Sequence, residues 1–367
     1  MKNKAKFMNW ERRNLMKKLL KLIGVILMVL SLVACSGQSS NNESTGTTEG
    51  GEVDYSQELI IYTNSASGGR GEWLVEKAKE AGFNIQMVQV PGGELTDRVI
   101  AEKNNAIADM VYGINVMDMN KLKAQDLLIQ FTPVWIDKID KSLADSEGYY
   151  NPVFVQPLIL IGNPDVDVMP NDWTELGEQY TQKYALHGLT GGTGRAILGS
   201  IISRYLDENG ELGVSEEGWK VVEAYIKGNN ALQGGQDMMA RILDPEDEVQ
   251  YGMMWASGAL QGQKDYDVKF KVMAPEIGVP FVTEQTAILN TSKKQELAKE
   301  FINWFGSAEI LEEYSANFGS IPANNDSKVG EDIEDLLSIV KPQDLDWELI
   351  GSHLDEWVEK VELEYVQ

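Results

Sequence analysis

The chain has one cysteine and two histidines among its 367 residues, and this scarcity excludes several kinds of protein. A single cysteine cannot form a disulfide within the chain, so the folded part must be stabilised by its core alone. His187 and His353 belong to no cluster with the spacing of a metal site. The motifs Gly-x-Ser-x-Gly of serine hydrolases and His-Glu-x-x-His of zinc proteases are absent as well. We therefore expect a protein that is not an enzyme and that carries no cofactor and no metal.

Basic residues are scarce too. The chain has 32 Lys and Arg against 57 Asp and Glu, which gives a net charge of −25. With the eight basic residues and the one acidic residue of the first 34 positions set aside, 24 basic and 56 acidic residues remain, a net charge of −32. Such a balance argues against nucleic acid, which requires a basic surface, and against a flat position on anionic lipid. A site for an anion would have to be a local pocket that works against the overall field.

The first 34 residues have the layout of a secretory signal. Lys17, Lys18 and Lys21 precede an apolar stretch over 22–34, and this order is typical of export. The stretch is shorter than the about 20 residues that a spanning helix needs. Its end, Leu32-Val-Ala-Cys35, resembles the lipobox of bacterial lipoproteins, which implies cleavage before Cys35 and a lipid on its sulfur. An uncleaved anchor is the alternative, and both interpretations place the remaining chain outside the cytoplasm and tethered to the membrane.

Residues 35–56 predict a lipidated cysteine followed by a flexible linker. The run from 36 to 52 has no apolar side chain that could join a core, so we expect it to stay disordered. A coil of about 18 residues spans roughly 25 Å on average. About 310 residues follow the linker, enough for two lobes with separate cores.

The first part of the body alternates strand-like and helix-like segments. Short apolar runs at 59–63, 84–90 and 108–113 predict buried strands. Amphipathic stretches at 72–81 and 94–103, and a third up to 126, predict helices between and after them. This alternation indicates a mostly parallel sheet with helices on both faces. Polar turns follow the strands, at the edge where such sheets hold ligands.

The second part continues the α/β pattern after an extended apolar stretch over 153–162. The predicted helices and strands are, in order, helices at 171–184, 195–207, 215–227 and 235–243, a strand at 249–254, extended segments at 268–274 and 281–289, and helices at 293–305 and 308–318. The acidic segment 331–366 is expected to be one further helical region, in which Trp347 and Trp357 serve as packing anchors.

The order of these segments resembles that of a known family. The matching stretches are Glu58-Leu-Ile-Ile-Tyr-Thr-Asn64, Pro91-Gly-Gly-Glu-Leu-Thr-Asp-Arg98, Ala108-Asp-Met-Val-Tyr-Gly113, Ala274-Pro-Glu-Ile-Gly278, Thr286-Ala-Ile-Leu-Asn290 and Ala298-Lys-Glu-Phe-Ile-Asn-Trp-Phe-Gly-Ser-Ala-Glu309. Together they look like a bacterial extracellular solute-binding protein of an ABC importer, from the branch that includes ferric-iron, thiamine and aminoethylphosphonate binders. The likeness covers about residues 57–325.

The resemblance implies a type II periplasmic-binding-protein-like α/β fold with two lobes and extended hinge crossovers. Residues 57–155 would form the first part of lobe one, residues 156–275 lobe two, and residues 276–367 the rest of lobe one with the C-terminal helices. The stretches 153–161 and 271–283 would be the crossovers. The family works as a monomer that closes on a small-molecule solute and delivers it to the transmembrane subunits of an ABC permease.

In lobe one, the candidate solute-binding residues are those of the strand-end turns. Such turns bring polar side chains and the free amides at helix starts to one edge, and these favour an anion or a polar oxygen. Ordinary helix capping by Ser or Asn is the alternative for each. The candidates are Asn64, Ser65, Ser67 and Gly68 in the first turn, Gly93 and Glu94 in the second, and Asn115 in the third.

In lobe two, the turn Thr190-Gly-Gly-Thr-Gly-Arg195 opens a helix. Its hydroxyls, amides and guanidinium predict a cradle for phosphate, phosphonate or carboxylate, and the Gly-Lys-Ser/Thr ending of a nucleotide P-loop is absent. A flexible turn with a surface arginine is the alternative. The candidates are Thr190, Thr193, Gly194 and Arg195, followed after the next strand by Ser257 and by Trp255, which would form either an apolar wall or part of the core.

The predicted solute is small, polar and anionic. Three other solutes stay open on the same fold. Thiamine is one. Ferric ion is another, although the stretch 251–255 has one tyrosine where iron binders have an adjacent pair, and the pair Tyr149–Tyr150 lies before the first crossover. A polyamine held by Glu94 and other acids is the third. An exported hydrolase or a scaffold lipoprotein is the alternative from another class.

Overall fold

The computed structural model describes residues 53–234 and 236–366. The predicted signal peptide, Cys35 and the linker up to residue 52 lie outside this part of the chain. Within it, no helix combines the length and the apolar character that crossing a bilayer would require.

The first three predicted strands are confirmed as a parallel group. β1 (Glu58–Thr63) lies between β2 (Asn84–Gln89) and β3 (Met110–Tyr112). From Leu59 to Thr63 its side chains are buried or partly buried on both faces of the sheet, which explains the nearly continuous apolar run. The helices that follow these strands are α2 (Arg70–Glu80), α3 (Gly92–Ala101) and α4 (Val116–Ala124).

Two long strands join this group to the rest of the sheet. β4 (Asn151–Gly162) pairs antiparallel with β9 (Phe281–Ile288) over its first half, and with β7 (Tyr251–Trp255) over its second half. β9 also runs antiparallel to β3, while β7 is parallel to the short β5 (Tyr184–Ala185). The sheet is therefore mixed, and the expectation of a mostly parallel sheet is wrong because the crossover strands are themselves central members of it. The short strands β8 (Lys271–Val272) and β10 (Ile321–Pro322) pair with β4.

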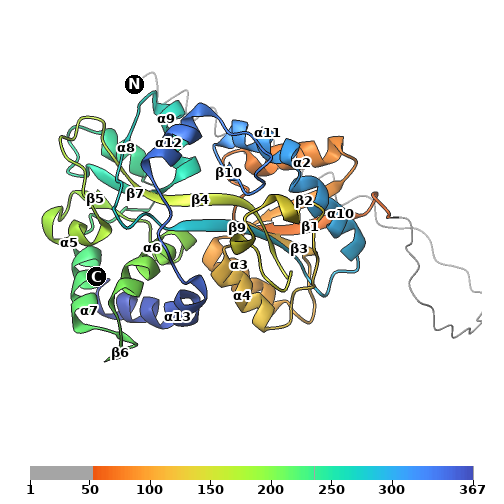
Figure 1. Ribbon diagram of the computed structural model, residues 1–367, viewed down its shortest axis with the longest axis horizontal. Coiled ribbons are helices and arrows are strands. Elements are labelled where there is room, and N and C mark those ends of the chain that lie inside the picture. The colour runs from red at the N-terminus through yellow and green to blue at the C-terminus, as the bar shows by residue number, and fades with distance from the viewer. Residues whose placement is uncertain (1–52, 235, 367) are drawn as a thin grey trace, which may run out of the picture. The chain divides into compact units, whose positions relative to one another are not determined.

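The middle of the chain supplies a second group of helices around β5 and β7 (Figure 1). α6 is buried along most of its length, from Ala196 to Ile202, in a core shared with α7. Three features differ from the sequence prediction. The helix expected at 171–184 is reduced to a 3-10 turn and the short α5, and Tyr184 belongs to strand β5. The helix expected up to residue 207 ends at Ile202 and is followed by a short strand, and a helix, α9, starts directly after Trp255 where only a turn was expected. The elements are α5 (Leu176–Gln179), α6 (Gly192–Ile202), β6 (Leu206–Glu211), α7 (Glu216–Lys227), α8 (Met238–Leu243) and α9 (Ala256–Tyr266).

The C-terminal region contains four helices: α10 (Gln295–Phe305), α11 (Ala308–Phe318), α12 (Glu331–Ile339) and α13 (Trp347–Glu364). The single helical region expected over 331–366 is thus two helices. The break contains Pro342, which cannot continue a helix and restricts the residue before it. The backbone there bonds to Val279 instead: Val279 N–H donates to the Lys341 carbonyl at 2.9 Å, and Gln343 N–H donates to the Val279 carbonyl at 2.9 Å.

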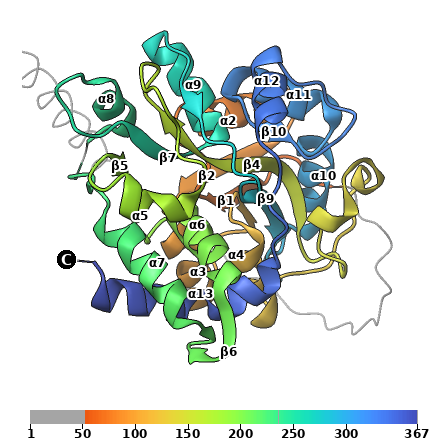
Figure 2. The same ribbon diagram turned by 60° about the vertical axis from the view of Figure 1, so that its left-hand side comes forward.

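α13 packs away from the other C-terminal helices. It lies against α4, α6 and α7, as Figures 1 and 2 show near the bottom of the molecule. Trp357 is fully buried in the core of α6 and α7, and its Nε1–H donates to the Leu212 carbonyl at 3.0 Å. This confirms Trp357 as a packing anchor. α13 thus contacts helices from both halves of the chain, and the expected domain boundaries at 155 and 275 stay a prediction.

Candidate functional site

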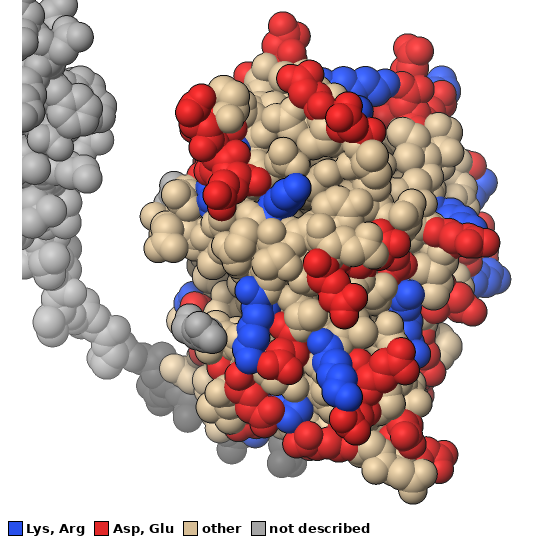
Figure 3. Space-filling view, turned by 90° about the vertical axis from the view of Figure 1, so that its left-hand side faces the viewer, with Lys and Arg blue, Asp and Glu red and all other residues tan. Residues whose placement is uncertain are grey.

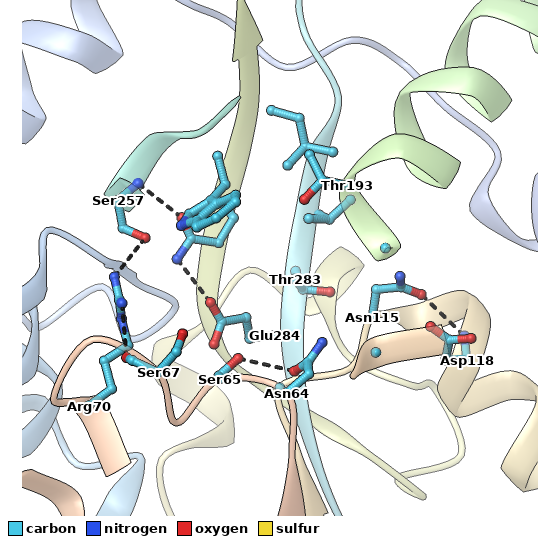
Figure 4. Close-up of a pocket in the computed structure, with 17 residues that line it drawn as sticks. Asn64, Ser65, Ser67, Arg70, Asn115, Asp118, Thr193, Ser257, Thr283 and Glu284 are labelled. Atoms are coloured by element: carbon cyan, nitrogen blue, oxygen red, sulfur yellow. Dashed lines mark hydrogen bonds between the residues drawn. The ribbon is translucent and has the colours of Figure 1, made fainter. Parts of the chain in front are cut away.

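A cavity of about 220 Å³ lies where the two groups of helices meet the long strands β4 and β9 (Figure 4). Of the thirteen candidates from the sequence, seven line it: Asn64, Ser65, Ser67, Asn115, Thr193, Trp255 and Ser257. The other six do not line it: Gly68, Gly93, Glu94, Thr190, Gly194 and Arg195. The main lining residues that the sequence did not single out are Arg70, Asp118, Gln156, Thr283 and Glu284. Contact of any of them with a solute stays a prediction.

One wall of the cavity is the turn after β1. Gln89 fixes this turn, since its Nε2–H donates to the Asn64 carbonyl at 3.0 Å and its Oε1 accepts from Ala66 N–H at 2.8 Å. The Ser65 hydroxyl donates to Asn64 Oδ1 at 3.1 Å. Gly113, at the end of β3, has a φ of 99° and lies so close that a Cβ would come within 2.4 Å of Asn64 Oδ1. Only glycine fits there, so the two strand-end turns form one continuous polar surface.

Arg70, the first residue of α2, extends its guanidinium into the cavity. Its hydrogen bonds are long: Nη1 to the Ser67 carbonyl at 3.3 Å, and Nη2 to Ser257 Oγ and to the Phe318 carbonyl at 3.4 Å each. The guanidinium carbon lies 5.4 Å from the centre of the Phe318 ring. Among the described residues, Arg70 is the one basic side chain that lines the cavity, and no carboxylate forms an ion pair with it. It is therefore a partly buried cation whose strongest type of partner is missing.

Four helices begin at this cavity without a side-chain cap. The first residues of α2, α3 and α6 and the N-cap residue of α9 line the cavity, and the N-cap residues Gly69, Pro91, Gly191 and Trp255 give no capping hydrogen bond. α4 differs, because Asn115 Oδ1 accepts from the N–H groups of Met117 at 3.0 Å and Asp118 at 3.1 Å. Asn115 thus has the capping role that the sequence left open. Uncapped helix starts present partial positive charge. Some of their amides are already bonded, however, since Gly71 N–H of α2 donates to the Ala66 carbonyl at 3.0 Å and Ser257 N–H of α9 donates to Gln156 Oε1 at 3.4 Å.

The long strands supply the floor of the cavity. Glu284 on β9 accepts from Gln156 Nε2–H on β4 at 2.9 Å and from the Tyr112 hydroxyl at 3.1 Å. Burial raises the pKa of Tyr112 well above its ordinary value, with Tyr314 and Glu284 acting in the same direction, so its hydroxyl stays protonated and donates. Thr283 lies beside Glu284 with its hydroxyl toward the cavity (Figure 4).

Trp255 closes the cavity beside Ser257. Its ring is half-buried and lies 5.5 Å from the ring of His187. Burial lowers the pKa of His187, which favours the neutral imidazole. Trp255 therefore has both roles that the sequence left open: it packs against the protein on one side, as a core residue does, and it lines the cavity on the other.

Arg195 lies outside this cavity and has a carboxylate partner. Its guanidinium pairs with Asp355 of α13, and Lys121 Nζ of α4 lies 2.8 Å from the same carboxylate. Gly93 and Arg195 line a second cavity, of about 190 Å³. Gly93 also approaches the turn before α6 closely, since a Cβ on it would come within 2.4 Å of the Thr190 carbonyl oxygen.

An iron site would require tyrosines in the cavity. The two candidate tyrosines instead form hydrogen bonds with other parts of the protein. The Tyr251 hydroxyl donates to the Val168 carbonyl at 2.7 Å, and the Tyr150 hydroxyl donates to Asn120 Oδ1 at 2.8 Å. Neither residue lines the cavity. In the part of the chain that the structure describes, no three His, Cys, Asp or Glu side chains are grouped as a metal would need.

Comparison with known proteins shows the family to which this chain is related. The model of the bacterial extracellular solute-binding protein family matches residues 105–352. A probable ABC transporter periplasmic-binding protein, y4fP of Sinorhizobium fredii, is 33% identical over 318 residues, which cover 84% of this chain and 87% of the relative.

Solved structures resemble the fold at low sequence identity. The apo ferric ion-binding protein A of Pasteurella haemolytica aligns with a TM-score of 0.72 at 15% identity, over 83% of this chain and 97% of the other. The periplasmic binding protein AfuA of Actinobacillus pleuropneumoniae, with fructose-6-phosphate bound, aligns with a TM-score of 0.70 at 17% identity, over 84% and 98% of the two chains.

The fold and the cavity between its two groups of elements define a type II periplasmic-binding-protein-like protein. The chain belongs to the bacterial extracellular solute-binding protein family. It is an extracytoplasmic solute-binding protein of an ABC transporter, and proteins of this family bind and deliver solutes rather than catalyse reactions.

Proposed function

We propose that the cavity binds a small polar solute through an anionic group, which is a phosphonate, a phosphate ester or a carboxylate, and that the protein delivers this solute to a membrane permease. The observation that carries the proposal is Arg70. Its guanidinium lines the cavity without a carboxylate partner, beside uncapped helix starts. A guanidinium binds a planar or tetrahedral oxyanion through charge-assisted hydrogen bonds, and helix starts add to this attraction.

The location of Arg70 also makes the site selective. Figure 3 shows acidic side chains spread over one face of the molecule with basic side chains among them, and the net charge of the chain is −25. An anion approaching such a surface is repelled unless a local group compensates. Arg70 supplies that compensation at its own end of the cavity, while the carboxylates of Asp118 and Glu284, which also line the cavity, favour a solute whose anionic group lies at Arg70. The fructose-6-phosphate of the AfuA structure is an anion of the proposed kind.

A calorimetric titration of the purified protein with phosphonates, phosphate esters and carboxylates tests the proposal. A charge-assisted hydrogen bond contributes about 1.5–3 kcal/mol, so Arg70→Ala should weaken binding of the best solute about 10- to 100-fold. Arg204→Ala is the matched control, because Arg204 pairs with Asp172 away from the cavity at 2.7 Å and should leave affinity unchanged. Unchanged affinity in Arg70→Ala would refute the anion site. A polyamine that binds more tightly after this substitution would favour the cationic alternative.

We further propose that the mature protein is anchored to the membrane by a lipid on Cys35. The sequence Leu32-Val-Ala-Cys35 at the end of a signal-like segment supports this. Cys35→Ser should release the protein into the medium or stop its processing, which fractionation and mass spectrometry of the amino terminus would detect. The melting temperature of the body should not change, because the linker separates position 35 from the core. Membrane retention of the processed variant would contradict the lipid anchor.

A further inference from the structure

α4 belongs to the first group of helices through most of its buried side chains. Met119 and Leu122 are fully buried in a core that they share with β1, β3 and α3. Met117 differs, because it is 4% exposed and lies in the other core, with Ile350 and Leu354 of α13 and the buried side chains of α6 and α7. α4 thus inserts one side chain into the core of the opposite group.

α13 is anchored to the second group of helices. Trp357 and Val361 are fully buried in the core of α6 and α7. A glycine lets α13 lie close to α6, since a Cβ at Gly199 would come within 2.6 Å of Ile350 Cγ2. Close packing of this kind leaves little freedom for α13 to leave α6. If the two groups of helices separate, α13 therefore stays with α6 and α7, and its contact with α4 is the one that breaks.

The contact between α4 and α13 has an apolar part and an ionic part. Gly351 of α13 faces Met117, since a Cβ at position 351 would lie 3.2 Å from Met117 Cβ and Cγ. Beside it, Lys121 Nζ lies 2.8 Å from Asp355 Oδ2. The Asp355 side chain is 63% exposed, so this ion pair contributes little. Burial of the methionine is the larger part and favours the joined form about 10- to 100-fold.

The second cavity borders this contact. Its volume is about 190 Å³, and Met117, Gly351 and Leu354 are among the residues that line it. The packing between α4 and α13 is therefore interrupted, whereas the core of α6 and α7 is continuous. A contact that already adjoins a cavity has fewer partner atoms to lose on separation than a close-packed core.

We propose that the contact between α4 and α13 is a clasp, which closes when the two groups of helices come together around the anion site and opens when they move apart. Burial of Met117 stabilises the closed arrangement in addition to the contacts of the solute. Release of a solute then requires that the clasp opens, so the C-terminal helix helps to set how long a solute is held. The inference goes beyond the proposed function, because the clasp acts whatever solute binds.

Cysteine labelling of the full chain tests whether the clasp opens, and it needs no solute. Met117→Cys places a thiol in the clasp, and Val222→Cys places one in the core of α6 and α7, where Val222 is fully buried. Each protein reacts with a maleimide under native conditions, and mass spectrometry of the labelled peptides separates these sites from Cys35. The thiol of Met117→Cys should react at least about tenfold faster, because the clasp opens locally and the core is exposed only by unfolding.

Gly351→Ala, added to Met117→Cys, separates opening from static exposure. The added methyl group crowds α4, so labelling should become about two- to fivefold faster. Ser352→Ala, at the next and exposed position of α13, is the control and should leave the rate unchanged. Lys121→Gln should raise the rate less than about twofold.

Equal labelling rates of Met117→Cys and Val222→Cys would refute the clasp, and so would a rate that Gly351→Ala does not change. Both results would leave the anion site standing, because the titration of Arg70→Ala tests that site separately. Loss of the anion site would in turn leave the labelling rates as predicted.

Discussion

Two turns of this protein have nearly the same local residue pattern but different surroundings in the folded chain. The turn over 64–70 and the turn over 190–195 are both rich in glycine and hydroxyl groups, and both carry an arginine in the first turn of an uncapped helix. In the first turn, Arg70 lines the cavity without a carboxylate partner. In the second, Arg195 pairs with Asp355 of a helix that is 160 residues away in the chain.

An arginine in a glycine-rich turn is therefore a candidate anion ligand only if no carboxylate of the protein already pairs with it. The sequence favoured Arg195 because a cation in so acidic a chain needs either an anion or an acidic neighbour. The structure supplies the acidic neighbour, and contact of Arg195 with a solute stays a prediction. Three substitutions test whether their surroundings account for the different states of the two turns.

The largest effect should come from Gly93→Ala. The added Cβ would lie 2.4 Å from the Thr190 carbonyl oxygen, so α3 and the second turn must move apart. Because the cavity is lined from both sides, we expect about a tenfold or greater loss of solute affinity. Small-angle scattering should show a larger radius of gyration with solute present.

Gly188→Ala is the control for this change. A Cβ at position 188 meets nothing closer than the Thr190 hydroxyl at 3.9 Å, so the second turn should keep its place. Equal affinity in Gly93→Ala and Gly188→Ala would show that the two sides do not need this close approach.

A smaller effect is expected from Asp355→Asn, which should make the second turn more like the first. Without its carboxylate partner, Arg195 becomes available to an anion, and affinity for an anionic solute should rise about two- to fivefold. In the wild-type background, Arg195→Ala should change affinity less than twofold, whereas the sequence alone predicts a loss of one to two orders of magnitude. Adding Arg195→Ala to Asp355→Asn should cancel the gain. A gain that persists in the double variant would exclude Arg195 as its cause.

The smallest effect concerns the stability cost of Asp118, which lines the cavity of Arg70 and that of Arg195. Burial raises its pKa in the folded protein, so its contribution is most favourable below the ordinary value of 3.8 and is lost as the pH rises through the raised pKa. Asp118→Asn should therefore raise the melting temperature of the solute-free protein at pH 7 by about 1–2 °C. Calorimetric scans at decreasing pH should show this gain shrinking toward pH 4. A constant gain would mean that titration of Asp118 is not its source.

The sequence was informative wherever local rules decide the structure. Parallel strands that end at one edge bring their turns together, which is why Asn64, Ser65 and Asn115 were found. The break between α12 and α13 contains Pro342, a local signal for a helix end, so one continuous helical region over 331–366 was the wrong prediction. Amphipathic periodicity defined α10 and α11 within two residues.

The residues that were missed depend on tertiary contacts. Arg70 follows a glycine- and hydroxyl-rich turn like that of Arg195, so the local pattern could have made it a candidate, but only the start of α2 at Arg70 shows that its side chain reaches the cavity. Asp118 and Glu284 are two of 57 acids, and only burial and their neighbours make them exceptional. The partner of Arg195 could not be inferred, because α13 meets α6 only in the folded chain.

The position of β4 has a consequence for how the protein unfolds. This one strand hydrogen-bonds to β9 along its first half and to β7 along its second, so each half of the sheet is completed by the same continuous segment. Melting either half would strip β4 of backbone partners and expose a strand that is buried along all twelve residues. The two halves should therefore lose their structure as one cooperative unit rather than in succession.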